Sequence, residues 1–259
     1  NELGLIKDAS KLQTFIDNAL IPMVKGLADQ PGLGGYEIIN EPCGSIQIAA
    51  SNNNCTDTTR LSNSGAGWTN MNVAMQDMQR FINLQTAAIK EADPKALVTV
   101  GIWNEQAGTD AFGYFNYFKD ECLVNAGGKE NGVLDFQQFH TYAFNGKYDA
   151  HSPIYQQASD YGLSVPLVVG EFENQLSEYP YPVEYSHFYN ASYNGAWAWC
   201  MNTNDAYGWK NIDVGVQALK GKPGIEVMIE KTVIPAARCW CSDVPPDSQY
   251  SCQQQAGWG

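Results

Sequence analysis

Gly35-Tyr36-Glu37-Ile38-Ile39-Asn40-Glu41-Pro42 is the stretch of sequence that indicates the fold. Its aromatic and β-branched residues predict a short strand, which begins after Gly34 and ends at Pro42, because proline cannot donate to a continuing ladder. An amide and a carboxylate, Asn40 and Glu41, stand at its carboxyl end, where a buried strand would ordinarily remain apolar. Acidic residues at the carboxyl ends of parallel strands are typical of (β/α)8 barrel enzymes, whose chemistry takes place at that mouth.

A second predicted strand, much later in the chain, also ends in a carboxylate. It comprises Pro166-Leu167-Val168-Val169-Gly170-Glu171-Phe172. A single Glu after a strand is usually a solvated loop residue, but two of them at strand ends indicate a pair of catalytic carboxylates. Cleavage of a glycosidic bond needs a proton for the leaving oxygen and a negative group at the anomeric carbon. Glu41 and Glu171 can supply both once their environments separate their pKa values, and Asn40 is placed to bind a neighbouring sugar hydroxyl.

Three further strands are expected, at residues 97–102, 133–142 and 195–199. The first delivers Trp103 to the mouth. The second ends in His140 and Tyr142, which share one face of the strand because side chains alternate. A lone strand histidine is commonly structural, but this pair at the mouth, in a chain with only three histidines, indicates function. On the third strand, Trp199 is nearest the mouth and is the candidate sugar platform, whereas Trp197 is expected in the core.

Helices are expected between these strands, at residues 8–28, 69–92, 111–123 and 154–161. The first has Asp8 or Ser10 as its N-cap, and the second is capped by Thr69. The methionines of the second helix, among them Met71 and Met75, are interpreted as core packing. Strand and helix alternate without hairpins, which predicts parallel βαβ units. The predicted fold is therefore α/β, a (β/α)8 TIM barrel of which this chain supplies about five of the eight strands.

The composition limits the classes of function. The 259 residues, 44% of them hydrophobic, fit one large domain. A formal net charge of −13 argues against nucleic acid and anionic membranes as partners, and no apolar run is long enough to span a bilayer. A neutral polysaccharide is compatible with this charge. The fourteen Tyr and seven Trp residues include enough aromatic side chains for sugar platforms, although most of them are expected in the core. The chain is expected to act as a monomer.

Seven cysteines and two sequons, Asn54-Cys55-Thr56 and Asn190-Ala191-Ser192, indicate a secreted glycoprotein from an oxidising compartment. The chain does not open with a signal peptide, so we expect that it has been processed or cut down. Residues 43–67 form a long polar loop, which Cys43 and Cys55 are close enough in sequence to staple. The odd number of cysteines leaves one thiol free or one partner absent.

The two strand ends, Asn40-Glu41-Pro42 and Gly170-Glu171-Phe172, resemble those of glycoside hydrolase family 5. The sequence around them resembles the endo-β-1,4-mannanases of molluscs and small arthropods within that family. The resemblance implies a secreted, retaining enzyme that cleaves β-1,4-mannosidic bonds in mannan, galactomannan or glucomannan by double displacement. It implies neither a metal nor a cofactor.

The same resemblance implies roles for individual residues. Glu41 would be the acid/base, Glu171 the nucleophile, and Asn40 a binder of the sugar 2-hydroxyl. His140 and Tyr142 would support the two carboxylates. The aromatic substrate contacts would be Trp103 and Trp199. For a retaining mechanism we expect the two carboxyl groups ~5–5.5 Å apart, with the Tyr142 hydroxyl within hydrogen-bond reach of Glu171.

The resemblance begins inside the third βα unit of the family. We therefore expect this chain to supply about the last five βα units, as an open parallel sheet, and to follow roughly a hundred or more residues in the gene. Residues 1–236 are predicted to be the barrel portion, and residues 237–259 a Cys- and Trp-rich appendage with a structural or a sugar-binding role.

Two other functions remain open. One is an endo-β-1,4-glucanase, since family 5 contains both activities on one fold. The other is a non-catalytic polysaccharide-binding protein that keeps the barrel. The presence of both Glu41 and Glu171 argues against the binding protein, which has no need of two strand-end carboxylates.

Overall fold

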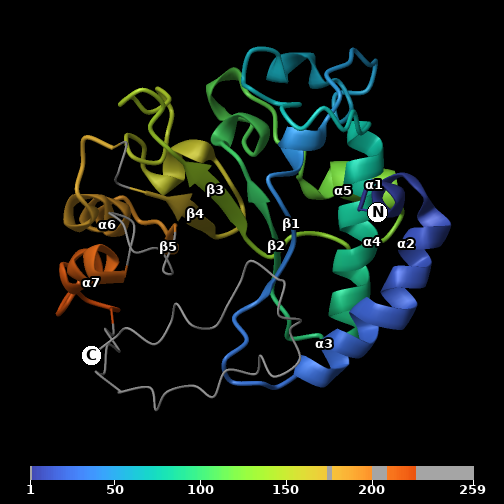
Figure 1. The fold of residues 1–259 in the computed structure, drawn as a ribbon, viewed down its shortest axis with the longest axis horizontal. Coiled ribbons are helices and arrows are strands. Elements are labelled where there is room, and N and C mark those ends of the chain that lie inside the picture. Colours follow the sequence, from blue (N-terminus) through green and yellow to red (C-terminus); the bar gives the residue numbers. More distant parts are fainter. Residues whose placement is uncertain (1, 174–176, 200–208, 226–259) are drawn as a thin grey trace, which may run out of the picture.

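The structure, a computed structural model, describes residues 2–173, 177–199 and 209–225. Its centre is one parallel sheet in the order β1-β2-β3-β4-β5, with helices along its outer side (Figure 1). The strands are β1 (Tyr36–Asn40), β2 (Val98–Ile102), β3 (Gln137–Thr141), β4 (Leu167–Phe172) and β5 (Gly195–Ala198). Strands that follow one another in the chain pair in parallel, as in the wall of a (β/α)8 barrel. The five predicted strands and the open parallel sheet are confirmed.

Helices alternate with the strands. Those in the described part of the chain are α1 (Glu2–Lys7), α2 (Ala9–Phe15), α3 (Ile21–Leu27), α4 (Met75–Ala92), α5 (Asp120–Gly127), α6 (Tyr181–Asn190) and α7 (Trp209–Gln217). A π-helical turn, η1 (Ile16–Leu20), joins α2 to α3. The 3-10 turns are η2 (Pro42–Ser45), η3 (Thr58–Leu61), η4 (Glu105–Ala107), η5 (Ala111–Gly113) and η6 (Ala158–Tyr161). Helix α4 packs against α1, α3 and α5, and α6 packs against α7. Among the described residues, no helix combines the length and the apolar character that crossing a membrane requires.

The helix predicted at residues 8–28 begins where expected but is divided into α2, η1 and α3, whereas α1 was not predicted and α4 begins later than expected. Asp8 caps α2 by accepting hydrogen bonds from the backbone N–H groups of residues 10 and 11. Thr69 does not cap α4, which starts at Met75 after Ala74. The Thr69 hydroxyl instead donates to the carbonyl oxygen of Gly44 at 2.9 Å, because the chain before α4 runs back along η2. Met71 therefore lies outside the helix, while Met75 is buried in the core as predicted.

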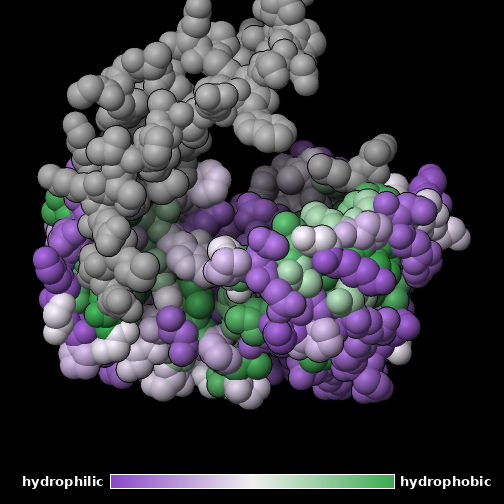
Figure 2. Space-filling model, turned by 90° about the horizontal axis from the view of Figure 1, so that it is seen from below, coloured by the Kyte–Doolittle hydropathy of each residue, from purple (hydrophilic) through white to green (hydrophobic). Residues whose placement is uncertain are grey.

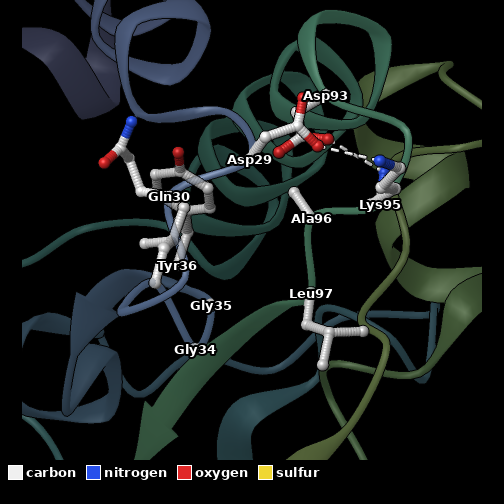
Figure 3. Close-up of a pocket in the computed structure, with 10 residues that line it drawn as sticks. Asp29, Gln30, Gly34, Gly35, Tyr36, Asp93, Lys95, Ala96 and Leu97 are labelled. Carbon is white, nitrogen blue, oxygen red and sulfur yellow. Dashed lines mark hydrogen bonds and ion pairs between the residues drawn. The ribbon is translucent and has the colours of Figure 1, made fainter.

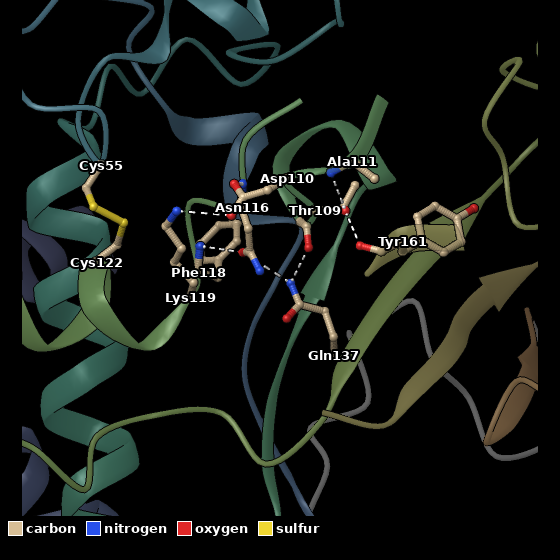
Figure 4. Close-up of polar contacts among 11 residues, drawn as sticks. Cys55, Thr109, Asp110, Ala111, Asn116, Phe118, Lys119, Cys122, Gln137 and Tyr161 are labelled. Carbon is tan, nitrogen blue, oxygen red and sulfur yellow. Dashed lines mark hydrogen bonds and ion pairs between the residues drawn. A yellow bond between two sulfur atoms is a disulfide. The ribbon is translucent and has the colours of Figure 1, made fainter. Parts of the chain in front are cut away.

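Residues 111–123 do not form one helix, contrary to the prediction. Turn η5 is followed by a loop, and α5 begins only at Asp120. Phe112 and Gly113 have positive φ values of 58° and 82°, which an α-helix does not accommodate. The loop is held by side chains, with Asp110 accepting from the backbone N–H of Asn116 at 2.9 Å (Figure 4). The helix predicted at residues 154–161 is likewise reduced to the single turn η6.

A disulfide ties the long polar loop to the helical layer, but not as predicted. Cys55 bonds Cys122 on α5, with the two Cα atoms 5.3 Å apart (Figure 4). Cys43 is a buried free thiol in η2, because its side chain points into the core. Burial, together with the charge of Glu41, raises the pKa of this thiol to about 12. The remaining four cysteines (Cys200, Cys239, Cys241 and Cys252), like the predicted appendage at residues 237–259, lie outside the described residues.

Buried amides of α4 reinforce the attachment of this loop. Gln79 is fully buried, and its Nε2 donates to the carbonyl oxygens of Cys55 at 2.7 Å and Tyr117 at 2.9 Å. Asn83, one turn later, donates to the carbonyl oxygens of Lys129 and Gly132. Buried polar groups persist only when they are paired in this way. The two amides thus hold the loops that follow β1 and α5 against the core.

The concave side of the sheet is apolar toward the amino-terminal ends of the strands. Seen from below, hydrophobic side chains reach the surface of this end at several places (Figure 2). Leu97, Phe136, Val168 and Trp197 line a cavity there. Trp197 is 48% exposed, so the expectation that it lies in the core is wrong for the described residues. Its strand, β5, is the last of the sheet, and the Trp197 ring meets Phe136 edge-on at 6.2 Å.

Candidate active site

Glu41 is aimed by an irregular end to β1. The pairing of β1 with β2 shifts register between Glu37 and Asn40, and Glu41 itself has a left-handed backbone with φ 45° and ψ 55°. Its N–H donates to the carbonyl oxygen of Gly101 at 2.7 Å, and Pro42 then opens η2. A left-handed non-glycine residue costs about 1–3 kcal/mol and is concentrated at functional sites. Here the turn directs the Glu41 carboxylate toward β3.

His140 lies between the two strand-end carboxylates. It is directly opposite Glu171 in the register of β3 and β4, and only 1% of it is exposed. Its Nδ1 is 2.9 Å from Glu41 Oε1 and 3.4 Å from Glu171 Oε2. Because β1 and β4 are separated by two strands, the imidazole from the intervening β3 is what connects their carboxylates.

Tyr142 completes the cluster from the loop after β3. Its hydroxyl donates to Glu171 Oε2 at 2.6 Å, as the sequence predicted. One oxygen of Glu41, one oxygen of Glu171 and one ring nitrogen of His140 all lie within 4.8 Å of one another. Such a spacing could also let one small cation contact all three side chains.

The charge state of Glu171 results from opposing influences. Burial raises the pKa of this carboxyl group, and the charges of Glu41 and Glu37 raise it further. His140 and the hydrogen bond from Tyr142 act in the opposite direction. Burial and the hydrogen bond to Glu171 also raise the pKa of Tyr142, so its hydroxyl keeps its proton and remains a donor. His140 and Tyr142 thus oppose an upward shift of the Glu171 pKa whose largest cause is burial.

The predicted aromatic contacts lie at the carboxyl ends of other strands. Trp103 follows β2, and its ring centroid is 5.2 Å from that of Trp68 at an angle of 60°. Trp68 is 45% exposed, and sequence reasoning missed it because its position depends on the path of the polar loop. Trp199 follows β5 and is 52% exposed, and its backbone N–H donates to the carbonyl oxygen of Phe172 at 2.8 Å. Asn40 is exposed at the end of β1.

Sequence reasoning also missed buried acids that lie near the cluster. Glu173 follows the β4 strand and is 3% exposed, and Glu184 on α6 is fully buried. Glu184 accepts a hydrogen bond from the Tyr148 hydroxyl at 2.9 Å, and burial raises its pKa to about 7. The short spacing from Glu171 to Glu173 was the only signal in the sequence for this group.

Comparison with known proteins identifies close relatives. The chain is 42% identical over 228 residues to a mannan endo-1,4-beta-mannosidase of Cryptopygus antarcticus. The matched region covers 86% of this chain and 59% of that protein. It is 44% identical over 222 residues to the enzyme of the same name from Mytilus edulis, with 85% and 59% covered. No family model matches the sequence.

Solved structures agree with these relatives. The beta-1,4-mannanase of the sea hare Aplysia kurodai superposes with a TM-score of 0.82 at 44% identity, covering 85% of this chain and 62% of that one. The endo-1,4-beta-mannanase of Eisenia fetida gives a TM-score of 0.81 at 44% identity, with 84% and 61% covered. This chain thus spans about three fifths of the length of its relatives. In sequence and in fold, over about 85% of its length, the chain is similar to endo-β-1,4-mannanases of molluscs and arthropods.

Proposed function

We propose that this chain carries the catalytic carboxylates of a secreted, retaining endo-β-1,4-mannanase. The observation that supports this most directly is the cluster in which His140 contacts both Glu41 and Glu171 while Tyr142 donates to Glu171. Closely spaced carboxyl groups leave no room for a water between one of them and the sugar. This favours direct attack by a carboxylate, with retention, over attack by water, with inversion. The relatives' name, mannan endo-1,4-beta-mannosidase, supports mannan as the substrate.

In the first step Glu171 is the nucleophile. One of its carboxylate oxygens attacks the anomeric carbon as the glycosidic C–O bond breaks, and Glu41 gives its proton to the leaving oxygen. The hydrogen bond from Tyr142 holds the Glu171 carboxylate in position for this attack. In the second step Glu41 takes a proton from a water molecule, whose oxygen attacks the anomeric carbon and releases Glu171. His140 lies against both carboxylates and holds their relative orientation.

Substrate contacts follow from the positions around this cluster. Asn40 adjoins Glu41 and is exposed, so its amide is available to a sugar 2-hydroxyl. Trp199, exposed at the end of β5, offers an aromatic face to the reactive sugar ring. Trp103, paired with Trp68, offers a second aromatic surface at the end of β2. The polymer would be bound at the carboxyl edge of the sheet, which is where barrel enzymes hold their substrates.

Secretion is supported by the sulfur chemistry and by the two sequons. The Cys55–Cys122 disulfide is expected in an oxidising compartment. Asn54 and Asn190, the acceptor residues of the sequons, are both exposed. The protein is proposed to act as a monomer on an extracellular polysaccharide.

The experiment that tests the proposal is a comparison of substrates by the full-length enzyme. Release of reducing ends from galactomannan, and little or none from carboxymethylcellulose, is the expected result. NMR of the first products should show the β-anomer before mutarotation, since retention preserves the configuration. Preferential cleavage of carboxymethylcellulose would support the glucanase alternative. Binding to mannan with no cleavage of either polymer would support the binding protein, and an initial α-product would overturn the double displacement.

A further inference from the structure

A second polar layer lies directly beneath the carboxylate cluster. Gln138 on β3 is 1% exposed, and its Nε2 donates to Glu37 Oε2 on β1 at 2.6 Å. Glu37 precedes Glu41 by four residues, and Gln138 precedes His140 by two. In a barrel, the side chains of one layer come from alternate strands. Here β1 and β3 supply a carboxylate and an amide just below the reacting groups.

Strands β2 and β4, which alternate with β1 and β3, carry glycines at this level. Gly101 on β2 pairs with Gln138, and a Cβ at Gly101 would lie 2.9 Å from Glu37 Oε1 and 3.0 Å from His140 Nε2. A Cβ at Gly170 on β4 would collide with the Gln138 side chain. The two glycines therefore make the room in which the Glu37–Gln138 pair and the His140 ring meet. The space that a Cβ on Gly101 would occupy, here called the Gly101 hollow, lies between Glu37 of the lower layer and His140 of the upper one.

His140 presents a different environment to each of its ring nitrogens. Nδ1 faces Glu41 and Glu171. Nε2 is buried and has no hydrogen-bond partner among the described residues. It faces the Gly101 hollow, toward which both Glu37 Oε1 and Asn40 Oδ1 are also directed. Which imidazole nitrogens carry protons is set by what each one faces. Acceptor oxygens lie on both sides of the ring, and the two beside Nε2 favour a proton there whether or not Nδ1 also carries one.

We propose that Glu37 is a positioning residue, whose carboxylate across the Gly101 hollow holds a proton on Nε2 of His140. The ring is then oriented from below by Glu37, and Nδ1 is left to contact the two reacting carboxylates. The inference rests on the proposed roles of Glu41 and Glu171. Glu37 itself touches neither the sugar nor the reacting atoms, and it acts through His140 and through its charge.

The charge of Glu37 predicts an effect on pH dependence. The groups that face Glu171 are His140 and Tyr142 on the β3 side and Glu41 and Glu37 from β1, with Glu173 near Tyr142. Glu37 is one of the groups that raise the pKa of Glu171. Removing its charge should therefore lower that pKa and move the acidic limb of the kcat/KM profile to lower pH.

The test is Glu37→Gln in the full-length enzyme, since a Gln side chain can still accept from Gln138 but carries no charge. Long-range 1H–15N NMR reports directly which imidazole nitrogens are protonated, and only three histidines have to be distinguished. We expect Nε2 of His140 to be protonated in the unaltered enzyme and to lose proton occupancy in Glu37→Gln. The variant should also lose about tenfold in kcat and show the acidic limb shifted to lower pH.

Two variants serve as controls. Glu37→Asp keeps the charge, so the Nε2 signal and the acidic limb should remain near those of the unaltered enzyme even where the rate falls. Asp29→Asn removes an exposed carboxylate from the opposite end of the sheet and should change neither. If Glu37→Gln does not fold, Gln138→Met, which keeps Glu37, should retain the Nε2 proton despite a loss of stability.

The proposal would be overturned by an unprotonated Nε2 in the unaltered enzyme, by an unchanged spectrum and pH profile in Glu37→Gln, or by loss of the Nε2 proton in Gln138→Met. The NMR measurement needs no substrate. A protein that cleaves no mannan but shows the predicted Nε2 signal would contradict the proposed function alone.

Discussion

The two ends of the parallel sheet are built from the same strands, yet their polar groups differ in how they are partnered. At the carboxyl end, Tyr142 and His140 contact the Glu171 carboxylate at 2.6 and 3.4 Å. At the amino end, the Tyr36 hydroxyl is buried without a partner among the described residues. Tyr36 lines a pocket at this end of the sheet (Figure 3). Among the residues that line this pocket, Asp29 and Lys95 form an ion pair at 2.8 Å.

The difference shows at which end of the sheet the polar groups hold one another in place. The Asp29–Lys95 pair is mostly exposed, with side chains 78% and 82% accessible. Water therefore screens the two charges, and the pair does little to fix the position of either side chain. The cluster at the carboxyl end is built around the buried His140, with Glu41 and Glu171 partly buried beside it. Its hydrogen bonds join His140 on β3 to Glu41 after β1, and Tyr142 after β3 to Glu171 on β4. We therefore propose that the chemistry takes place at the carboxyl end and that the amino end serves packing, as in other barrels. Four substitutions test this contrast.

The largest effect is expected from Glu171→Ala. Without the proposed nucleophile, kcat on every mannan substrate should fall by about 10⁴-fold or more. The folded structure should persist, because the variant removes a partly buried charge. Steady-state kinetics and circular dichroism of the full-length enzyme check this. Turnover within a factor of ten of the unaltered enzyme would remove Glu171 from the mechanism.

A smaller and substrate-dependent loss is expected from Glu41→Ala. General acid catalysis contributes about 10²- to 10⁴-fold, so cleavage of mannan should fall by that factor. An aryl mannoside with a good leaving group needs no proton in the first step and should lose much less. Rates on the two substrates give the comparison. If Glu171→Ala showed the leaving-group dependence and Glu41→Ala did not, the two roles would have to be exchanged.

Tyr142→Phe should reduce kcat/KM by about 10- to 100-fold, because a hydrogen bond to a charged group is worth about 1.5–3 kcal/mol. The Tyr142 hydroxyl holds the pKa of Glu171 down. Its removal should raise that pKa and move the acidic limb of the profile to higher pH, opposite in sign to the shift expected for Glu37→Gln. A pH–rate profile measures the shift, and a limb that stays in place would contradict the assigned contact.

Tyr36→Phe is the matched substitution at the amino end and should have the smallest effect. The hydroxyl it removes is buried without a described partner, so the free energy of unfolding should change by less than about 1 kcal/mol. Kinetics and the pH profile should stay as in the unaltered enzyme. A loss of activity comparable to that of Tyr142→Phe would mean that the two ends of the sheet are not separated in function.

The elements recovered from the sequence are those with a local signature. The strands at Tyr36 and at Leu167 are short apolar runs bounded by glycine or proline, and each carries its Glu at the carboxyl end. Parallel strands place their carboxyl ends along one edge, so the proximity of Glu41 and Glu171 followed once the βαβ order was recognised. His140 and Tyr142 were found by assuming alternation along one strand, although β3 ends at Thr141 and Tyr142 follows it.

Elements whose ends depend on distant contacts were predicted less well. Thr69 has the chemistry of an N-cap, but its hydroxyl is used by Gly44, and α4 begins after the returning chain. Residues 111–123 have the composition of a helix, yet the positive φ values at Phe112 and Gly113 break it. In both cases tertiary contacts outweighed local propensity, which is a weak determinant of helix ends.

The sequence by itself determined the order of strands and helices and the carboxylates at two strand ends, because periodicity and chain direction are properties of neighbouring residues. Only the tertiary structure decided that Cys55 pairs with Cys122 rather than with Cys43, and that Gln138 meets Glu37 across the strand that carries Gly101. Such pairings depend on which side chains the closed packing brings within a few ångströms. Spacing along the chain does not contain that distance.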